Sequence, residues 1–498
     1  MTAEMGGYMG TVSTQPPTQS TIIDVLNDAP TSFFHLRAAF TAGMGFFTDA
    51  YDLFIIGSAL VYLKPEWHLS NTEIAFLGSI SLIAAFLGAI VFGRLADIIG
   101  RKRIYGLEAV LMVIGGLACA WAPSFIWLLV FRVILGLGIG GDYPMSAVLM
   151  AEYANAKKRG ALTSLVFGMQ GLGLAFGPVV ALTLEASGLP PDSIWRIMLG
   201  LGALPPLAVL YLRRTMPESP RYKALVRGDA DQAAKDMAVY SSGQVRATSE
   251  HTTKPARVSW GEMLSNRKYL LLILGTGGAW FLNDYAFYGN AISTPEIIRL
   301  LAPTSSSMTA SAWALIIFTV FAIPGYLASI FFMDAVGHRR LQWIGFAVMA
   351  LAFAAMALIP GITHEVLPFL LVYGVSFFFI EFGPNCTTFV MPSEVYPTSI
   401  RATGHGMAAG IGKFGAFIGT FVFPFIAAEG GIKGAMLFSA GVSVLGAILT
   451  KLTLPEPSGK TLEEISGEDG DLGISSAPEM TGLALNIAAS PCPSGRDA

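Results

Sequence analysis

The chain has 498 residues, of which 53% are hydrophobic and 13% are charged, whereas soluble domains carry roughly 25% charged residues. This composition excludes an ordinary soluble protein and predicts an integral membrane protein with several spans. The formal net charge is only -3, so the charge indicates no nucleic-acid partner. The cysteines Cys119, Cys386 and Cys492 form an odd set, which predicts no disulfide framework.

The chain begins with a polar segment, residues 1–33, that lacks the basic and apolar regions of a secretory signal peptide. We expect it to be cytoplasmic and disordered. Two all-α bundles of six transmembrane helices follow, 34–214 and 267–454, separated by a cytoplasmic loop, 215–266, with short helices. The polar tail, 455–498, is expected to be cytoplasmic and disordered. The apolar segments long enough to cross a bilayer are 34–63, 74–93, 104–122, 125–153, 160–186, 195–213, 267–293, 311–333, 341–360, 365–392, 402–427 and 433–454.

Lysine and arginine are distributed unequally among the connections between these spans. The connections that follow even-numbered spans hold most of them, including Arg101, Lys102 and Arg103, whereas those that follow odd-numbered spans hold few. Basic residues favour the cytoplasmic side of a membrane. The distribution therefore predicts that both termini and the central loop are cytoplasmic.

The two halves of the chain repeat one another. Because each half has an even number of spans, the repeats run parallel, related by an axis along the membrane normal. Three pairs of residues are separated by nearly the same distance along the chain: Asp97 with Asp334, Glu152 with Glu394, and Asp49 with Asp284. We interpret a further set as charge pairs that latch the halves at their cytoplasmic ends: Arg94, Asp97, Arg101, Glu152, Arg159, Glu394 and Arg401.

The fourth span carries a glycine run followed by an acid. Gly136, Gly138 and Gly141 formally match a dinucleotide-binding pattern, but that motif follows a strand and opens a helix, and a continuous apolar helix offers neither. Small residues in a membrane helix instead let another backbone approach closely. An ionisable residue inside a span is costly, so Asp142 is a functional candidate. We expect Asp142 and Tyr143 to face a cavity.

Ionisable and strongly polar residues within the expected spans form a short set. Trp280, Asp284 and Tyr288 are spaced i, i+4, i+8 and share one helix face. Gln170 and Lys413 fall at nearly equivalent positions in the two repeats. The set is Asp49, Asp52, Arg132, Asp142, Gln170, Asn283, Asp284, Glu381, Asn385 and Lys413, with Tyr143, Trp280, Tyr285 and Tyr288 beside them.

Structural roles stay open for several of these residues. Arg132 and Glu381 can be partners of other buried charges. Asp52 can face the outer vestibule or pair with a neighbour. Trp280 and Tyr288 can belong to a packed apolar stripe, although the acid between them argues against it.

One lysine among several hydrogen-bond donors suits an oxyanion. Asp142 and Lys413 are hard to explain as structural residues unless they pair with each other. Several carboxylates in the same region would repel an anion unless they are protonated, and burial favours the protonated form. The pattern therefore predicts a proton-coupled anion site. The donors beside the lysine are Tyr143, Gln170, Trp280, Tyr288 and Asn385.

Several local patterns resemble those of a known family. The more general ones are Gly93 to Lys102, Pro217 to Tyr222 and Pro392 to Arg401; the more specific ones are Gly140 to Pro144, Ala151 to Asn155, Met169 to Gly171 and Phe382 to Phe389. On these residues the chain resembles the major facilitator superfamily and, within it, the phosphate:proton symporters of fungi and plants. The resemblance extends over about residues 35–465.

The resemblance implies alternating access in the cell (plasma) membrane, with the two halves rocking about a central site. It implies that Asp49 and Asp142 carry protons. Asp52 and Asn385 are possible additional site residues. The implied partners are inorganic phosphate, protons and the lipid bilayer, with a monomer sufficient for transport and no cofactor or metal. The residues implied to bind phosphate are Tyr143, Gln170, Trp280, Asp284, Tyr288 and Lys413.

Other functions stay open at this stage. The same fold can carry another solute, such as a glycerophosphodiester, a sugar or an organic anion, although Asp142 with Lys413 and Gln170 disfavours a sugar. A phosphate-sensing receptor would signal through the central loop, which contains no recognisable signalling module. A membrane enzyme is disfavoured because the embedded residues show no nucleophile beside a base.

Overall fold

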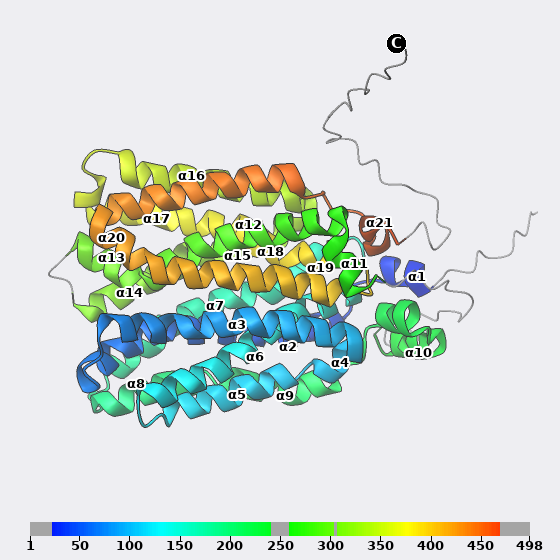
Figure 1. Ribbon diagram of the computed structural model, residues 1–498, viewed down its shortest axis with the longest axis horizontal. Coiled ribbons are helices and arrows are strands. Elements are labelled where there is room, and N and C mark those ends of the chain that lie inside the picture. The colour runs from blue at the N-terminus through cyan, green and yellow to red at the C-terminus, as the bar shows by residue number, and fades with distance from the viewer. Residues whose placement is uncertain (1–21, 241–257, 303–305, 469–498) are drawn as a thin grey trace, which may run out of the picture.

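The computed structural model describes residues 22–240, 258–302 and 306–468. Within these residues, 12 helices are long and apolar enough to cross a membrane, which confirms the predicted all-α membrane fold. In Figure 1 the first six spans occupy the lower half of the molecule and the last six the upper half. A helix suits a membrane because it satisfies its backbone N–H and C=O groups within one segment.

The transmembrane elements begin and end close to the apolar segments of the sequence. The first half comprises α2 (Phe33–Glu66), α3 (Asn71–Ile99), α4 (Arg101–Ile104) with α5 (Leu107–Ala120), α6 (Phe125–Tyr153), α7 (Arg159–Glu185), and α8 (Pro191–Leu201) with α9 (Leu204–Thr215). The second half comprises α12 (Arg267–Ile292), α14 (Ser307–Ile317) with η2 (Phe318–Ala322) and α15 (Ile323–Val336), α16 (His338–Leu358), α17 (Val366–Ile380) with η4 (Glu381–Asn385), α18 (Cys386–Val390) and α19 (Pro392–Val395), and α20 (Arg401–Thr453). The last two spans both lie in α20, which contains the non-helical residue Gly431 (φ 63°).

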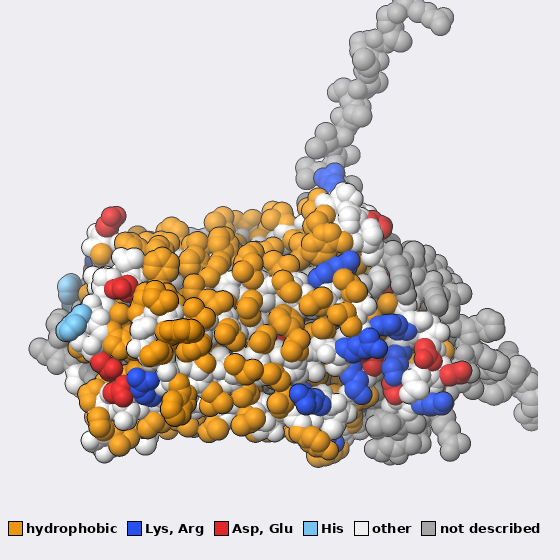
Figure 2. Space-filling model, turned by 60° about the horizontal axis from the view of Figure 1, so that its bottom comes forward, with side chains coloured by type: hydrophobic (Ala, Val, Ile, Leu, Met, Phe, Trp, Pro, Cys, Tyr) orange, Lys and Arg blue, Asp and Glu red, His pale blue; other side chains and the backbone are white. Residues whose placement is uncertain are grey.

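Large apolar side chains cover the flank of the bundle. Phe331, Leu351 and Leu358 are 76%, 70% and 66% exposed. Figure 2 shows an apolar, orange band along the length of the molecule, with charged side chains gathered towards its two ends. An apolar surface of this extent fits contact with lipid.

Glycines bring neighbouring helices into close contact. A Cβ atom on Gly140 of α6 would lie 2.0 Å from the carbonyl oxygen of Ala85 in α3. Across the two halves, a Cβ atom on Gly406 of α20 would lie 2.3 Å from the carbonyl oxygen of Ala89 in α3. Glycine is therefore needed for packing at these positions, and the glycine run of α6 is part of a helix contact.

Charge pairs join the two halves at the end of the bundle where α1 (Ile22–Asp28), α10 (Ala230–Tyr240) and α21 (Leu462–Ser466) lie (Figure 1). We call it the closed end. Arg159 of α7 donates to Glu394 of α19 at 2.7 Å. Arg401 of α20 donates to Glu152 of α6 at 3.1 Å. The predicted latch between the halves is therefore present, but Arg94, which was expected to take part in it, lies over the ring of Trp260 and forms no ion pair among the described residues.

Two aspartates at the closed end each bind the first turn of a helix in the other half. Asp97 of α3 accepts a hydrogen bond from the backbone N–H of Thr403 in α20 at 2.7 Å. Asp334 of α15 accepts one from the backbone N–H of Ala161 in α7 at 2.8 Å. These equivalent contacts agree with the predicted repeat, and a carboxylate at a helix N-terminus is electrostatically favourable.

The central segment holds η1 (Tyr222–Arg227), α10 (Ala230–Tyr240) and α11 (Trp260–Ser265), in agreement with the short helices expected there. Two segments expected to be disordered also contain helices, α1 (Ile22–Asp28) and α21 (Leu462–Ser466). The expectation was wrong for these residues. The remaining terminal residues, 1–21 and 469–498 with Cys492, lie outside the described part.

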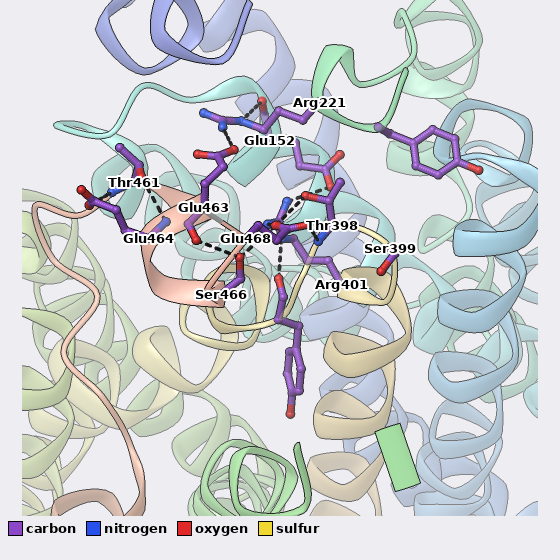
Figure 3. Close-up of polar contacts among 12 residues, drawn as sticks. Glu152, Arg221, Thr398, Ser399, Arg401, Thr461, Glu463, Glu464, Ser466 and Glu468 are labelled. Atoms are coloured by element: carbon purple, nitrogen blue, oxygen red, sulfur yellow. Dashed lines mark hydrogen bonds and ion pairs between the residues drawn. The ribbon is translucent and has the colours of Figure 1, made fainter. Parts of the chain in front are cut away.

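Arg221 joins both terminal helices. Its guanidinium donates to Asn27 of α1 at 2.8 Å and forms an ion pair with Glu463 of α21 (Figure 3). Burial alone would raise the pKa of Glu463, but Arg221 and Arg401 together hold that pKa below its usual value. The ion pair joins the two helices, and each also buries apolar side chains: Ile22 and Leu26 of α1 pack against Ala224 and Ala233, and Leu462 of α21 is fully buried.

Candidate functional site

The residues predicted to bind an anion converge on Lys413 of α20, between the two halves. Its Nζ atom donates to the hydroxyl of Tyr288 in α12 at 2.5 Å. The carboxylates of Asp284 in α12 and Asp49 in α2 lie 3.7 and 3.9 Å from Nζ. All four residues are at most 2% exposed, so their polar groups face one another with little solvent between them.

Asp49 links the first half to this lysine. Its carboxylate accepts hydrogen bonds from the hydroxyl of Tyr143 in α6 and from Nε2 of Gln170 in α7, the latter at 3.3 Å. The ammonium of Lys413 lies 4.4 Å from the ring centroid of Tyr143 and 4.3 Å from that of Tyr288, within reach of a cation–π interaction. One group therefore forms, which we call the Lys413 cluster: Asp49, Tyr143, Gln170, Asp284, Tyr288 and Lys413.

Trp280 forms an aromatic wall beside the cluster. It is fully buried, and its ring centroid lies 5.7 Å from that of Tyr143. A Cβ atom on Gly412 would lie 2.5 Å from the indole, so the residue before Lys413 must be small for Trp280 to pack here. The helix face predicted from the spacing on α12 thus places Asp284 and Tyr288 at the lysine and Trp280 against the neighbouring tyrosine.

Asn385, the additional candidate in η4, also reaches the cluster. Its Nδ2 atom donates to Glu381 at 2.5 Å, and its Oδ1 atom accepts from Asn283 at 3.2 Å. Asn283 also donates to Asp284 at 3.2 Å. Glu381 and Asn385 are the two ends of a π-helical turn, an irregularity that is frequent at functional sites.

Tyr326 of α15 is a residue that the sequence reasoning missed. Its hydroxyl donates to Oε1 of Gln170 at 2.7 Å and lies 2.9 Å from Nδ2 of Asn385. This contact orients the Gln170 amide so that its Nε2 atom points to Asp49. A Cβ atom on Gly171 would lie 2.7 Å from the Tyr326 ring, so the glycine after Gln170 was the one available signal.

Asp142 lies outside the Lys413 cluster and has its own cation. Arg213 of α9 donates to both of its carboxylate oxygens, at 2.6 and 3.0 Å, and Ser146 donates to it at 2.8 Å. Arg213 also donates to Glu108 of α5 at 3.1 Å. The pairing of Asp142 with Lys413, which the sequence left open, is therefore not observed.

Arg213, the last residue of the expected span 195–213, was not among the candidate site residues. It is fully buried in the last turn of α9, with its guanidinium 4.9 Å from the ring centroid of Tyr105. A Cβ atom on Gly45 of α2 would lie 1.7 Å from Asp142 Oδ2 and 2.4 Å from Arg213 Nη2. The glycine of α2 thus makes room for this ion pair.

Asp52, the other additional candidate, is also buried away from the lysine. A Cβ atom on Gly202 would lie 1.8 Å from its Oδ1 atom. Asp52 interacts electrostatically with Arg132 of α6, and the guanidinium of Arg132 has no hydrogen-bond partner among the described residues. The structure thus favours the reading in which Asp52 faces a neighbouring charge within the first half.

The Lys413 cluster has spare hydrogen-bonding capacity. Among the described residues, Asp49 Oδ1 and Asp284 Oδ2 have no hydrogen-bond partner. Lys413 carries three N–H donors, of which one is used in a hydrogen bond to Tyr288. Within the same residues, no group of three or more His, Cys, Asp or Glu side chains is placed to hold a metal ion. The cluster can therefore form new hydrogen bonds to a small polar ligand.

Twelve spans in two halves, with a polar centre buried between them, define a membrane transporter of the major facilitator fold. The chain belongs to the sugar (and other) transporter family, whose model matches residues 38–468. The proton:xylose symporter XylE shares the fold, with a TM-score of 0.74 at 21% identity over 87% of this chain and 98% of that chain.

Two relatives share a higher sequence identity with the chain, and both are named as phosphate transporters or permeases. The probable inorganic phosphate transporter 1-6 of Arabidopsis thaliana is 38% identical, covering 90% of this chain and 97% of that protein. The repressible high-affinity phosphate permease of Neurospora crassa is 33% identical, covering 91% of this chain and 90% of that protein. The family resemblance predicted from the sequence is confirmed.

Proposed function

We propose that the protein imports inorganic phosphate together with protons by alternating access of its two halves. The observation that carries this proposal is the Lys413 cluster, in which one buried lysine faces two carboxylates at 3.7 and 3.9 Å without a hydrogen bond to either. The names of the phosphate transporters from Arabidopsis thaliana and Neurospora crassa support the choice of solute.

Phosphate binds by exchanging places with internal partners of the lysine. Lys413 donates to a phosphate oxygen, and Tyr143 and Gln170 turn from Asp49 to the anion. Asp284 accepts a hydrogen bond from a hydroxyl of the phosphate, since an ionised carboxylate can only accept. Tyr288, Trp280 and, as an additional contact, Asn385 complete the binding site.

Protons are carried by Asp49 and Asp142. An anion can take the place of the Asp49 carboxylate beside Lys413 at lower electrostatic cost once Asp49 is protonated, which couples the two solutes. Asp142 shares Arg213 with Glu108, so two carboxylates face one guanidinium and the group can hold a proton. Asp52, beside Arg132, is an additional proton site.

The protein acts in the cell (plasma) membrane with both termini and the central loop in the cytoplasm. The basic residues at the closed end support this orientation, and Figure 2 shows Lys and Arg side chains gathered towards that end. A single chain contains the whole Lys413 cluster, so a monomer suffices. No cofactor or covalent catalysis enters the cycle.

Phosphate uptake by the purified protein in liposomes tests the proposal. We expect accumulation against a phosphate gradient when an inward proton gradient is imposed, and only equilibration without it. Competition by a glycerophosphodiester or an organic anion stronger than that by phosphate would favour the alternative solutes. Phosphate binding without any uptake would favour a phosphate-sensing receptor.

A further inference from the structure

A cavity of about 360 Å³ lies at the closed end, lined by residues other than those of the Lys413 cluster. Two arginines line its wall: Arg94 of α3 comes from the first half, and Arg227 of η1 comes from the central segment. Two hydroxyl groups line it as well: Ser259 precedes α11 in the central segment, and Ser399 lies between α19 and α20 in the second half. The volume falls within the range of small-molecule sites, roughly 300–1,000 Å³.

Neither arginine of the wall is neutralised. In the described part of the chain, Arg94 and Arg227 form no ion pair. The Arg94 guanidinium lies 5.5 Å from the ring centroid of Trp260, and Arg227 donates one hydrogen bond, at 2.8 Å, to the carbonyl oxygen of Ile99. Because a guanidinium carries five N–H donors, both groups keep donors for a ligand.

The acid in the wall, Asp97, is already engaged. Its carboxylate accepts hydrogen bonds from the backbone N–H and the hydroxyl of Thr403, at 2.7 and 2.6 Å, and pairs with Arg101 at 3.0 Å. The neighbouring Glu218 accepts hydrogen bonds from the backbone N–H of Lys102. The acids are thus engaged by other donors, whereas the two arginines, which lie over the rings of Trp260 and Tyr222, have no ion-pair partner among the described residues.

The two serines add hydrogen-bond donors to the wall. Ser259 Oγ accepts from the backbone N–H of Glu262 at 3.1 Å, and Ser399 Oγ accepts from that of Val258 at 3.3 Å. Each hydroxyl therefore keeps its own O–H to donate. Tyr222 adds an aromatic surface to the same wall. Guanidinium groups suit phosphate, and hydroxyls beside an aromatic ring suit a polyol.

We propose that this cavity binds a phosphorylated polyol, either a free metabolite or the head group of an anionic lipid. Its phosphate contacts Arg94 and Arg227, and its hydroxyls contact Ser259 and Ser399. Because the wall comes from both halves, the ligand binds better when the halves are together at the closed end than when they are parted. By that difference in affinity it holds the transporter closed and slows its cycle. The proposal does not depend on which solute is transported.

The test uses the purified full chain in nanodiscs. In phosphatidylcholine nanodiscs, thermal stability is measured while fructose bisphosphate is titrated as the soluble probe. In a second set, phosphatidylinositol phosphate is added to the lipid and thermal stability is compared with that in phosphatidylcholine alone. We expect Arg94→Gln to weaken the response to the effective probe by about tenfold, as for the loss of a charge-assisted hydrogen bond.

Arg103→Gln is the matched control, because Arg103 is exposed on α4 at the same end, outside the cavity wall, and the change in charge is the same. If fructose bisphosphate gives a response and Arg94→Gln weakens it, the ligand is a free metabolite. If only the lipid gives a response and Arg94→Gln weakens it, the ligand is a lipid head group. Ser399→Ala gives a second test if Arg94→Gln melts early in the absence of probe. Equal responses of the cavity variants and Arg103→Gln, or no response of the parent, would overturn the proposal.

Discussion

Arg213 and Lys413 each serve two buried carboxylates, yet they do so at different distances. Arg213 donates to Asp142 at 2.6 and 3.0 Å and to Glu108 at 3.1 Å. Lys413 lies 3.7 Å from Asp284 and 3.9 Å from Asp49, and its short hydrogen bond is to a tyrosine hydroxyl. Arg213 donates hydrogen bonds to both of its acids, whereas Lys413 lies between its two acids without a hydrogen bond to either.

The difference follows from the two side chains. A guanidinium is a rigid fork that fits a carboxylate with two hydrogen bonds, whereas an ammonium is a compact charge with rotatable donors. Lys413 can therefore pass from one partner to another, and Arg213 fixes Asp142 in place. We infer that the Lys413 cluster binds the transported anion, while Arg213 with Asp142 and Glu108 carries protons during the transport cycle. The following predictions test this division.

The largest effect is expected when the hydrogen-bonded ion pairs of Arg213 are broken. Arg213→Ala leaves Asp142 and Glu108 buried without their cation, and removing one partner of a buried pair costs about 3–5 kcal/mol. We expect a large drop in the melting temperature of the purified protein. Arg214→Ala is the matched control, because Arg214 is the neighbouring residue and is exposed. Similar melting temperatures for the two variants would contradict the structural role of Arg213.

A smaller effect is expected for Lys413→Ala, and it should fall on binding. The variant loses a charge-assisted hydrogen bond of about 1.5–3 kcal/mol, so phosphate affinity should fall roughly tenfold to a hundredfold. Equilibrium binding at fixed pH measures this change. Lys433→Ala, at an exposed position in α20, should bind as the parent does. Unchanged affinity in Lys413→Ala would remove the lysine from the site.

Asp142→Asn should separate binding from coupling. The amide keeps the shape of the side chain but cannot exchange a proton, and Arg213 keeps Glu108 as a partner. We expect phosphate affinity within about twofold of the parent, because Asp142 lies outside the Lys413 cluster, and loss of accumulation driven by a proton gradient. Asp192→Asn, which alters an exposed ion pair with Arg196, is the control. Gradient-driven accumulation at the parent level would refute the proton-carrying role of Asp142.

The spans and much of the site could be predicted because each rests on a local property. About 20 apolar residues are needed to cross a bilayer, and the spacing of Asp284 and Tyr288 on α12 places both on one helix face. Asp142 stood out because an ionisable residue inside a span is costly. Each of these signals comes from a single helix, so it does not require knowledge of which other helices pack against it.

The remaining features depend on contacts between distant segments. Arg213 could be read as a loop residue because it stands near the end of its span beside an exposed arginine. Its pairing with Asp142 joins α9 to α6. Tyr326 acts through Gln170, in the other half of the chain. Likewise, Arg221 joins two short helices that lie far apart in the sequence, through Asn27 of α1 and Glu463 of α21. In each case the information lies in a pair that the sequence does not bring together.

The smallest predicted effect concerns the choice between phosphate and sulfate at the Lys413 cluster. Near neutral pH phosphate keeps at least one proton, whereas sulfate has a similar shape and none. Asp284 Oδ2 has no hydrogen-bond partner among the described residues, so it is available to accept a hydroxyl of phosphate. With sulfate bound, the Asp284 carboxylate and a sulfate oxygen would face each other, and both can only accept hydrogen bonds. A buried group left unpaired in this way costs about 1–3 kcal/mol.

Asp284→Asn should therefore alter selectivity as well as affinity. The amide can donate as well as accept, so we expect weaker phosphate binding and, for the first time, measurable competition by sulfate. Arsenate, which is protonated as phosphate is, should compete with the parent and gain no new advantage in the variant. If Asp284 only carries a proton, the variant should lose coupling and still exclude sulfate. Competition binding at fixed pH without a gradient distinguishes the two, because it removes coupling from the measurement. Continued exclusion of sulfate by Asp284→Asn would therefore show that Lys413 and its other partners set the choice of anion.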